Sequence, residues 1–207
     1  MNRVAIIGYS GHAYVVLDAS VKMGLAIQYY CDKTYLGNRD PYGLSYLGDE
    51  SHADFVWDNV EGFVLGIGDN NIRARIAVSV KAKGKKLISV VHPSSLINDF
   101  VRLGEGVFLA SNCVLNPFAV VGDYCIINTG AIVEHECFLG SAVHIAPGAV
   151  LAGNIQVGDN TFIGANSVIK QGVKIGKNVI VGAGSVVLTD IPDGEKWVGN
   201  PARKMKK

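Results

Sequence analysis

The middle of the chain repeats every six residues. Residues 121–151 read VGDYCIINTGAIVEHECFLGSAVHIAPGAVL, and an aliphatic residue stands at every sixth place. The series runs without an insertion through Leu103, Leu109, Leu115, Val121, Ile127, Val133, Leu139, Ile145, Leu151, Val157, Ile163, Ile169, Ile175, Val181 and Val187. Smaller residues recur two places earlier, from Val101 to Ala149. Because residues two apart in a strand face the same side, each hexad predicts a short strand with two inward side chains.

The spacing of glycine indicates how many strands make up each turn of this repeat. It is abundant, with 25 of 207 residues, and it recurs at every third hexad, at Gly104, Gly122, Gly140, Gly158 and Gly176. One corner of a three-sided coil therefore takes glycine on each turn. We expect the backbone to bend tightly at that corner. Hexads of this kind predict a parallel β-helix over residues 92–188.

Residues 1–91 predict a small α/β domain with a Rossmann-like parallel sheet, because strand and helix patterns alternate. We expect strands at 3–8, 27–31, 63–67 and 87–91, and helices at 13–23 and from about residue 72 to 80. The first helix should end at Gly24 and the second before Gly84. The remainder of the chain, 189–207, forms a polar tail.

A glycine-rich turn precedes the first predicted helix. It contains Gly8, Ser10, Gly11 and His12, and a helix N-terminus after such a turn can bind phosphate. Asp32 ends the second predicted strand, where an acid accepts hydrogen bonds from a ribose in dinucleotide folds. The order G-x-x-G-H departs from G-x-G-x-x-G, so ordinary loop glycines are the open alternative.

Composition excludes several classes of protein. The formal net charge is +1, which gives no basic face for nucleic acid. Residues 137–158 lack Asp, Glu, Lys and Arg, but His144, Pro147 and four glycines argue against a membrane helix. The N-terminus does not read as a signal peptide. We expect a cytoplasmic protein that neither binds nucleic acid nor inserts into membranes.

Three cysteines, Cys113, Cys125 and Cys137, stand at successive intervals of two hexads. A metal site or disulfides would be one interpretation of this spacing. All three belong to the inward series of small residues, and a step of two hexads reaches another side of the triangle. We therefore expect buried small hydrophobes and no metal.

His135 is the strongest candidate for chemistry. Glu134, His135 and Glu136 interrupt a neutral stretch at a coil corner, and Gly153 stands three hexads after His135, one coil away. Acyl transfer needs a base and a donor for the oxyanion, and a histidine beside a backbone N–H provides both. A neighbouring carboxylate can fix the tautomer of the histidine. His144 should point outward from the coil, and two ordinary surface histidines are the alternative.

Several segments together resemble the bacterial sugar acetyltransferases, a family of hexapeptide-repeat acyltransferases. It includes UDP-4-amino-sugar N-acetyltransferases and sialic-acid O-acetyltransferase. The resemblance covers nearly the whole chain, and the central string is the most specific. The segments are IIGYSGH at 6–12, GDNNIR at 68–73, INTGAIVEHEC at 127–137, His144, AGN at 152–154 and GNPAR at 199–203.

The resemblance implies a homotrimer of left-handed β-helices with acetyl-CoA bound between adjacent subunits. By this resemblance His135 is the general base and Glu136 orients it. The residues implied near acetyl-CoA are Asn128, His144, Gly153, Gly182, Asn200, Pro201 and Arg203. The nucleotide sugar would lie against Gly8, Ser10, Gly11, His12, Asp32, Asn70 and Asn71. Some relatives carry two acids after the second strand, whereas Lys33 holds the second position here.

The function that we predict is acetylation of the 4-amino group of a nucleotide-linked, preferably UDP-linked, 4-amino-4,6-dideoxy sugar, without a metal. One alternative is O-acetylation of sialic acid. A second is a zinc-dependent trimer resembling the γ-type carbonic anhydrases. The separation of His135 and His144 in the sequence suits a zinc site of that type poorly. A third is a nucleotide-binding scaffold without catalysis.

Overall fold

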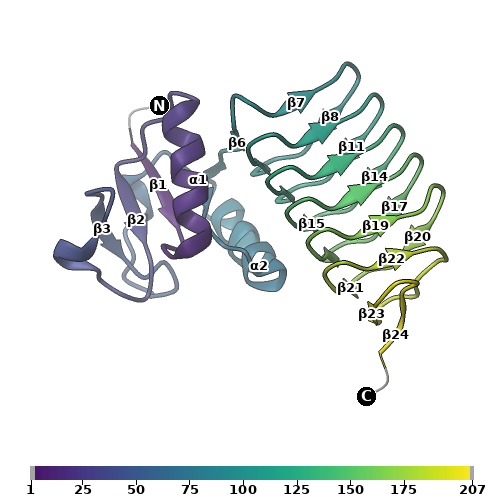
Figure 1. Ribbon diagram of the computed structural model, residues 1–207. Coiled ribbons are helices and arrows are strands. Elements are labelled where there is room, and N and C mark those ends of the chain that lie inside the picture. The colour runs from purple at the N-terminus through teal and green to yellow at the C-terminus, as the bar shows by residue number, and fades with distance from the viewer. Residues whose placement is uncertain (1–2, 206–207) are drawn as a thin grey trace.

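The N-terminal domain is a five-stranded parallel sheet with one helix on each face (Figure 1). The structure is a computed structural model that describes residues 3–205. Its strand order is β3-β2-β1-β4-β5. The elements are β1 (Val4–Ile7), α1 (Gly11–Lys22), β2 (Tyr29–Cys31), the 3-10 helix η1 (Gly37–Arg39), β3 (Ser45–Gly48), the 3-10 helix η2 (Trp57–Asn59), β4 (Gly62–Leu65), α2 (Asn70–Ala82) and β5 (Lys86–Leu87).

Alternate residues of β1 determine which helix covers which face. Val4 and Ile6 pack with Ala13 and Val16 of α1, and Ile7 packs with Val80 of α2. Each helix starts after a strand's carboxyl end. The strands β1, β2 and β4 and both helices were predicted from the sequence, with ends that differ by a few residues. The edge strand β3 was not predicted because its residues are only half-buried and lack an apolar run.

The prediction of a single strand at 87–91 is wrong. The structure divides this segment into β5, which pairs with β4 in the N-terminal sheet, and β6 (Val90–Val91), which pairs with β9 in the β-helix. One apolar run therefore serves two domains. The β-helix begins at β6, before the His92-Pro93 pair at which we expected it to start.

The β-helix is built from two-residue strands stacked in three parallel sheets. After β6 come β7 (Leu96–Ile97), β8 (Arg102–Leu103), β9 (Phe108–Leu109), β10 (Val114–Leu115), β11 (Val120–Val121), β12 (Ile126–Ile127), β13 (Ile132–Val133), β14 (Phe138–Leu139), β15 (His144–Ile145), β16 (Val150–Leu151), β17 (Gln156–Val157), β18 (Phe162–Ile163), β19 (Val168–Ile169), β20 (Lys174–Ile175), β21 (Ile180–Val181) and β22 (Val186–Val187). Two strands of the tail, β23 (Lys196–Val198) and β24 (Arg203–Lys204), extend the eight-stranded sheet.

The predicted repeat is confirmed. Each aliphatic residue of the series ends a strand and pairs with its counterpart three hexads away, as Val121 does with Leu139. From Leu109 to Val187 these side chains are buried in one continuous core. The three sheets contain β7, β10, β13, β16, β19 and β22; β8, β11, β14, β17 and β20; and β6, β9, β12, β15, β18, β21, β23 and β24.

The corner glycines serve a different purpose from the one expected. None of the five glycines at every third hexad has a positive φ. Instead, the next coil lies too close for a side chain: a Cβ on Gly122 would stand 2.7 Å from the carbonyl carbon and oxygen of Gly140. Positive φ values occur at other corner positions, for example at Gly130 and at the equivalent Asn112 and Asn166. Close stacking of coils, and not backbone bending, requires the periodic glycine.

The inward cysteines are buried and free, as predicted. Some of the small polar side chains also satisfy backbone carbonyls of the next coil. The Cys125 thiol donates to the Gly140 carbonyl at 3.0 Å, and the Thr161 hydroxyl donates to the Gly176 carbonyl at 2.7 Å. A buried carbonyl without a donor costs free energy, so these side chains stabilise the corners they face.

The two domains are joined through α2. Arg73 is 1% exposed and donates to the carbonyls of Tyr124 (2.7 Å, from Nε) and Ala142 (3.0 Å, from Nη2). Tyr124 and Ala142 occupy equivalent corners of successive coils, and both have a positive φ. Asn70 extends the junction by one coil, because its amide donates to the carbonyls of Asn160 and Thr161.

We predict that Gly122→Ala lowers the free energy of unfolding by about 2 to 3 kcal/mol, because the added methyl group would overlap backbone that cannot move independently. Gly130→Asn is the matched control, since Asn occupies the equivalent corner at Asn112 and Asn166, and it should change stability by less than about 0.5 kcal/mol. Urea unfolding followed by circular dichroism measures both. Equal stability of Gly122→Ala and the unmodified chain would show that stacking does not require glycine there.

Candidate active site

His135 and Glu136 form a hydrogen-bonded pair at a corner of the β-helix. His135 Nδ1 lies 3.1 Å from Glu136 Oε2, and both side chains are accessible, at 50% and 62% exposure. Because a carboxylate accepts, Nδ1 carries the proton and Nε2 keeps a free lone pair. An accessible imidazole with a defined basic nitrogen can act as a general base.

The ring of His135 lies directly against Gly153, the equivalent residue one coil further on. A Cβ on Gly153 would stand 2.5 Å from His135 Cε1 and 2.6 Å from Nε2. The neighbouring Asn154 N–H donates to the His135 carbonyl, whereas the Gly153 N–H makes no hydrogen bond within residues 3–205. The spacing of three hexads therefore predicted a close approach that the structure confirms, and the approach requires glycine.

Glu136 has a left-handed backbone conformation, with φ at +60°. The corresponding corner residues on neighbouring coils, Phe118 and Asn154, share it. The coil geometry therefore sets the backbone at this corner. The carboxylate reaches back to the preceding histidine from that position, which explains how adjacent residues can form the pair.

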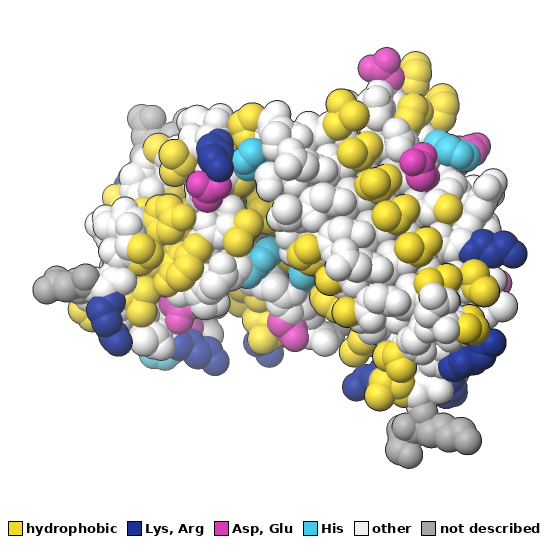
Figure 2. Space-filling model, in the orientation of Figure 1, with side chains coloured by type: hydrophobic (Ala, Val, Ile, Leu, Met, Phe, Trp, Pro, Cys, Tyr) yellow, Lys and Arg dark blue, Asp and Glu magenta, His cyan; other side chains and the backbone are white. Residues whose placement is uncertain are grey.

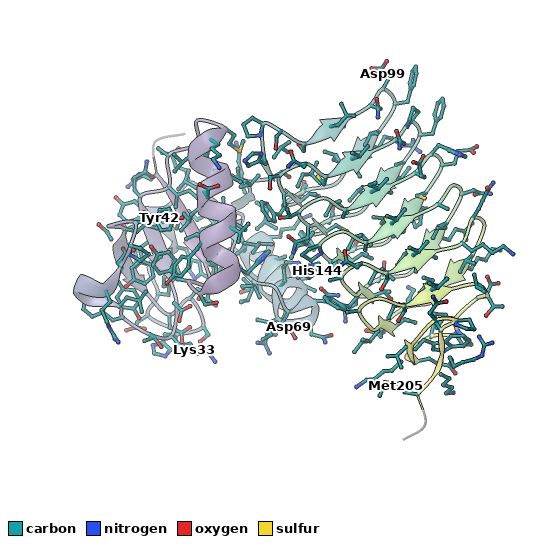
Figure 3. All side chains as sticks on the ribbon, viewed as in Figure 1. Lys33, Tyr42, Asp69, Asp99, His144 and Met205 are labelled. Carbon is teal, nitrogen blue, oxygen red and sulfur yellow. The ribbon has the colours of Figure 1, made fainter. Side chains whose placement is uncertain are left out.

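His144 is buried in the junction between the two domains. It points outward from the coil, as predicted, but the N-terminal domain covers it, so it is only 8% exposed and is not a surface histidine (Figure 3). Its Nδ1 lies 3.3 Å from the carbonyl of Gly68, and its Nε2 lies 3.1 Å from the amide nitrogen of Asn128. The carbonyl requires a proton on Nδ1, so Nε2 accepts from Asn128.

His12 lies close to His144 across the junction, with ring centroids 6.2 Å apart. Its Nε2 is buried and has no hydrogen-bond partner among the described residues. Burial, with a smaller contribution from the positive charge of Arg73, lowers the pKa of both His12 and His144 to about 4. Both rings are therefore neutral at physiological pH.

The glycine-rich turn packs tightly around β1. Gly8 has φ at +81°, and a Cβ there would stand 2.6 Å from the Ile67 side chain. Gly11 has open space around its Cα. Ser10 is the N-cap residue of α1 without a side-chain cap, so N–H groups of the first turn remain available to an anion.

Asp32 holds the turn rather than pointing freely into solvent. Its Oδ2 accepts from the Tyr9 N–H at 2.7 Å, and its Oδ1 accepts from the Thr34 N–H at 3.0 Å. A carboxylate can accept further hydrogen bonds, so contact with a ribose stays a prediction.

A cavity of about 410 Å³ lies where the N-terminus of α2 meets the eight-stranded sheet. Asn70 and Asn71 line it from α2, and Phe162 and Ile180 line it from the sheet. Asn70 is also bound to the β-helix corners, and Asn71 accepts a hydrogen bond from Asn160. Two of the predicted substrate residues therefore help to join the domains.

The tail residues predicted near the cofactor lie at the far end of the same sheet. β23 pairs with β21, and a Cβ on Gly182 would stand 2.5 Å from the Val198 side chain. β24 pairs with β23 and contains Arg203, while Asn200 and Pro201 form the turn between the two strands. The tail is therefore a part of the fold and not a solvated extension.

One chain places the predicted site residues in two separate groups. His135, Glu136 and Gly153 lie at the corner between the six-stranded and the five-stranded sheet, because His135 falls between β13 and β14. His12, Asn128 and His144 lie on the opposite side, where the eight-stranded sheet faces the N-terminal domain. Figure 2 shows histidine side chains both in the domain junction and at the far edge of the β-helix beside acidic side chains.

Two features are absent from residues 3–205. No group of three or more His, Cys, Asp or Glu side chains there is arranged to hold a metal ion. No helix in that part of the chain is long and apolar enough to cross a bilayer.

Known protein families match both domains. Residues 3–80 match the PglD N-terminal domain. Residues 136–171 match the bacterial transferase hexapeptide (six repeats), and residues 154–189 match the hexapeptide repeat of succinyl-transferase. The fold and these matches define a hexapeptide-repeat acyltransferase.

Solved structures narrow this class. A mutant of perosamine N-acetyltransferase from Caulobacter crescentus, in complex with CoA and GDP-perosamine, is 34% identical, with a TM-score of 0.93 and coverage of 100% of this chain and 98% of that one. The acetyltransferase domain of PglB from Neisseria gonorrhoeae is 31% identical (TM-score 0.90, coverage 99% and 100%). WeeI from Acinetobacter baumannii is 29% identical (TM-score 0.87, coverage 98% and 99%). The chain belongs to this family of sugar N-acetyltransferases.

The sequence alone does not reveal the importance of two residues, Arg73 and Gly66. Arg73 is an isolated arginine on a predicted helix, and such a residue gives no sign of burial. Gly66 was overlooked although a Cβ there would stand 2.4 Å from the Gly8 carbonyl. Gly66 lies inside the strand predicted at 63–67, and a glycine within a strand could have indicated this close backbone approach.

We predict that the lowered pKa of His144 makes the protein less stable as the pH falls from 6.5 to 4. In the unfolded chain His144 takes up a proton near pH 6.5, whereas in the folded protein it does so only near pH 4. Acid therefore favours unfolding over that interval. His144→Gln, which cannot be protonated, should flatten the dependence of the unfolding free energy on pH. Urea unfolding at pH values between about 4 and 7 measures this dependence, and identical slopes for His144→Gln and the unmodified protein would contradict burial of His144.

Proposed function

We propose that three copies of this chain form an enzyme that transfers the acetyl group of acetyl-CoA to the 4-amino group of a nucleotide-linked 4-amino-4,6-dideoxy sugar. The observation that carries this proposal is the His135–Glu136 pair lying against Gly153. A base with an oriented tautomer beside an unpaired backbone N–H meets the two needs of acyl transfer.

In the proposed reaction the 4-amine attacks the thioester carbonyl. His135 Nε2 accepts the amine proton as the new C–N bond forms, and Glu136 stabilises the resulting imidazolium through Nδ1–H. The Gly153 N–H is a candidate donor to the oxyanion. When the C–S bond breaks, His135 can return the proton to the departing thiolate, so the products are the amide and free CoA.

A second copy of the chain would complete the site. Within one chain, His135 and Gly153 lie on the side of the β-helix opposite to Asn128 and His144. A trimer can bring that corner of one subunit against the eight-stranded sheet of the next, which would gather both groups around one acetyl group. This arrangement agrees with a homotrimer.

The two substrates would approach along different surfaces. We infer that the nucleotide sugar binds the N-terminal domain, its phosphates at the turn formed by Gly8, Ser10 and Gly11, with His12 and Asp32 nearby. Acetyl-CoA would extend along the eight-stranded sheet from the tail, near Arg203, to the cavity lined by Phe162 and Ile180. The Caulobacter crescentus structure, which contains CoA and GDP-perosamine, supports a ternary complex of this kind.

His135→Ala should lower kcat by about 10²- to 10⁴-fold, because a general base is removed. The measurement is release of CoA thiol from acetyl-CoA with GDP- and UDP-linked 4-amino sugars, and with free sialic acid as the hydroxyl acceptor. Glu136→Gln should lower kcat less, and Lys22→Ala, at the exposed end of α1, is the control. Near-normal turnover of His135→Ala would remove the assigned base, and thiol release with sialic acid alone would favour O-acetylation.

A site shared between subunits predicts complementation. We expect His135→Ala and Asn128→Ala each to be defective alone, because each removes one half of the site. Co-expression of the two variants should restore activity, since random assortment leaves about one quarter of the interfaces with both halves intact. Gain of activity over either variant alone is the expected result. Activity no higher than the sum of the separate variants would mean that each chain contains a complete site.

A further inference from the structure

The peptide group between Ala152 and Gly153 has two sides with different surroundings. Its N–H belongs to Gly153, which lies against the ring of His135, and this N–H makes no hydrogen bond within residues 3–205. Its carbonyl belongs to Ala152 and accepts a hydrogen bond from the thiol of Cys137, whose sulfur lies 3.2 Å from the oxygen. No other group in the described part of the chain donates to this carbonyl.

The thiol of Cys137 determines which way the peptide group faces. Cys137 belongs to the inward series and is 1% exposed, so the carbonyl that it binds points into the coil. The peptide bond is trans, and a trans peptide carries its carbonyl and its N–H on opposite sides. The Gly153 N–H therefore points out of the coil, at the corner where the imidazole of His135 is accessible.

Another peptide of the β-helix shows what such an outward N–H can bind. The Gly140 carbonyl accepts from the Cys125 thiol inside the coil. The N–H of the same peptide group belongs to Ser141 and donates to Asp159 Oδ1 at 3.0 Å. A donor inside the coil is thus combined with a negatively charged oxygen outside it.

The same combination recurs two coils later. The Gly176 carbonyl accepts from the hydroxyl of Thr161 at 2.7 Å. The N–H of that peptide group belongs to Lys177 and donates to Asp193 Oδ1 at 2.8 Å. Because successive hydrogen bonds polarise one another, the inner donor strengthens the outer N–H as a donor to an anionic oxygen.

The peptide at Gly153 differs from those at Ser141 and Lys177 in what lies outside the coil. No carboxylate among residues 3–205 accepts from the Gly153 N–H, and the ring of His135 lies beside this residue instead. The outer side of the peptide is therefore accessible to an oxygen that gains negative charge during a reaction. The oxyanion of the tetrahedral intermediate in acyl transfer is such an oxygen.

The thiol stays protonated and can be replaced by a hydroxyl. Burial raises the pKa of Cys137 to about 11, so the sulfur keeps the proton that it donates at physiological pH. Thr161 and Ser167 occupy equivalent inward positions and make the same bond from a hydroxyl, at 2.7 and 2.9 Å. The coil therefore accommodates either kind of donor.

We propose that Cys137 is a positioning residue of acetyl transfer, whose thiol binds the Ala152 carbonyl and thereby directs and polarises the Gly153 N–H toward the oxyanion. The proposal rests on the proposed function, in which Gly153 is the candidate oxyanion donor. The thiol touches neither substrate and does not react. The same bond made by Cys125 supports only the fold, because Asp159 already occupies the N–H on which it acts.

The test measures release of CoA thiol at varied acetyl-CoA with a saturating nucleotide-linked 4-amino sugar. Cys137→Ala should lower kcat by about five- to tenfold, because an oxyanion donor is weakened but not removed. The KM for acetyl-CoA should change by less than about twofold, since the ground-state thioester carries no oxyanion. Cys137→Ser keeps a donor and should restore kcat to within about twofold of the unmodified protein.

Cys125→Ala is the matched control, because it removes an equivalent bond at another corner. It should lower the melting temperature about as much as Cys137→Ala does and leave kcat unchanged. Equal loss of kcat in both alanine variants would overturn the proposal, since the effect would then come from stability alone. Unchanged kcat in Cys137→Ala, or no recovery in Cys137→Ser, would also overturn it.

A second measurement needs no substrate and separates this proposal from the proposed function. In NMR spectra of the whole protein with isotope-labelled glycine, the Gly153 amide resonance should shift in Cys137→Ala and return in Cys137→Ser, because the peptide loses and regains its polarising bond. An unchanged Gly153 resonance in Cys137→Ala would overturn the proposal. Absence of thiol release by the unmodified protein would instead contradict the proposed function.

Discussion

The arrangement of this molecule depends on one buried cation. The guanidinium of Arg73 has five N–H groups, and all five find acceptors: the carbonyls of Ile67, Gly68, Tyr124 and Ala142 and the side chain of Asn70. Burial lowers the pKa of Arg73 to about 10, so the group stays charged. An unpaired buried charge is very costly, and these bonds therefore fix α2 against two successive coils.

This junction determines the environment of His12 and His144, which belong to the proposed acetyl site. Because α2 is held against the β-helix, the loop before it covers His144, and the Gly68 carbonyl fixes the proton on Nδ1. The same burial keeps His144 and His12 neutral. His135, at an uncovered corner, remains accessible to solvent beside Glu136. One chain thus contains a buried group and a solvent-exposed group of the predicted site residues, and the proposed trimer would bring the two groups together.

The sequence predicted the β-helix and the close approach of His135 to Gly153, because a repeat of three hexads per turn indicates directly which residues stack. It also predicted the order of β1, α1, β2, β4 and α2 from apolar runs and helix ends. It did not predict β3, whose half-exposed residues lack a pattern, or the division of residues 87–91 between two sheets. Nothing local in an apolar run tells which of two sheets each part will join.

The sequence by itself determined the contacts inside the coil, since its hydrogen-bonded ladder repeats and the neighbour one turn away always lies three hexads along the chain. It also indicated His135 and Glu136 as catalytic candidates, because they interrupt a neutral stretch of the repeat and because His135 stands one coil from Gly153. Only the tertiary structure decided which corner of the coil meets the N-terminal domain, which buries Arg73 and His144. That choice depends on two surfaces without a common repeat, whose shapes and hydrogen-bonding groups match only after both domains have folded.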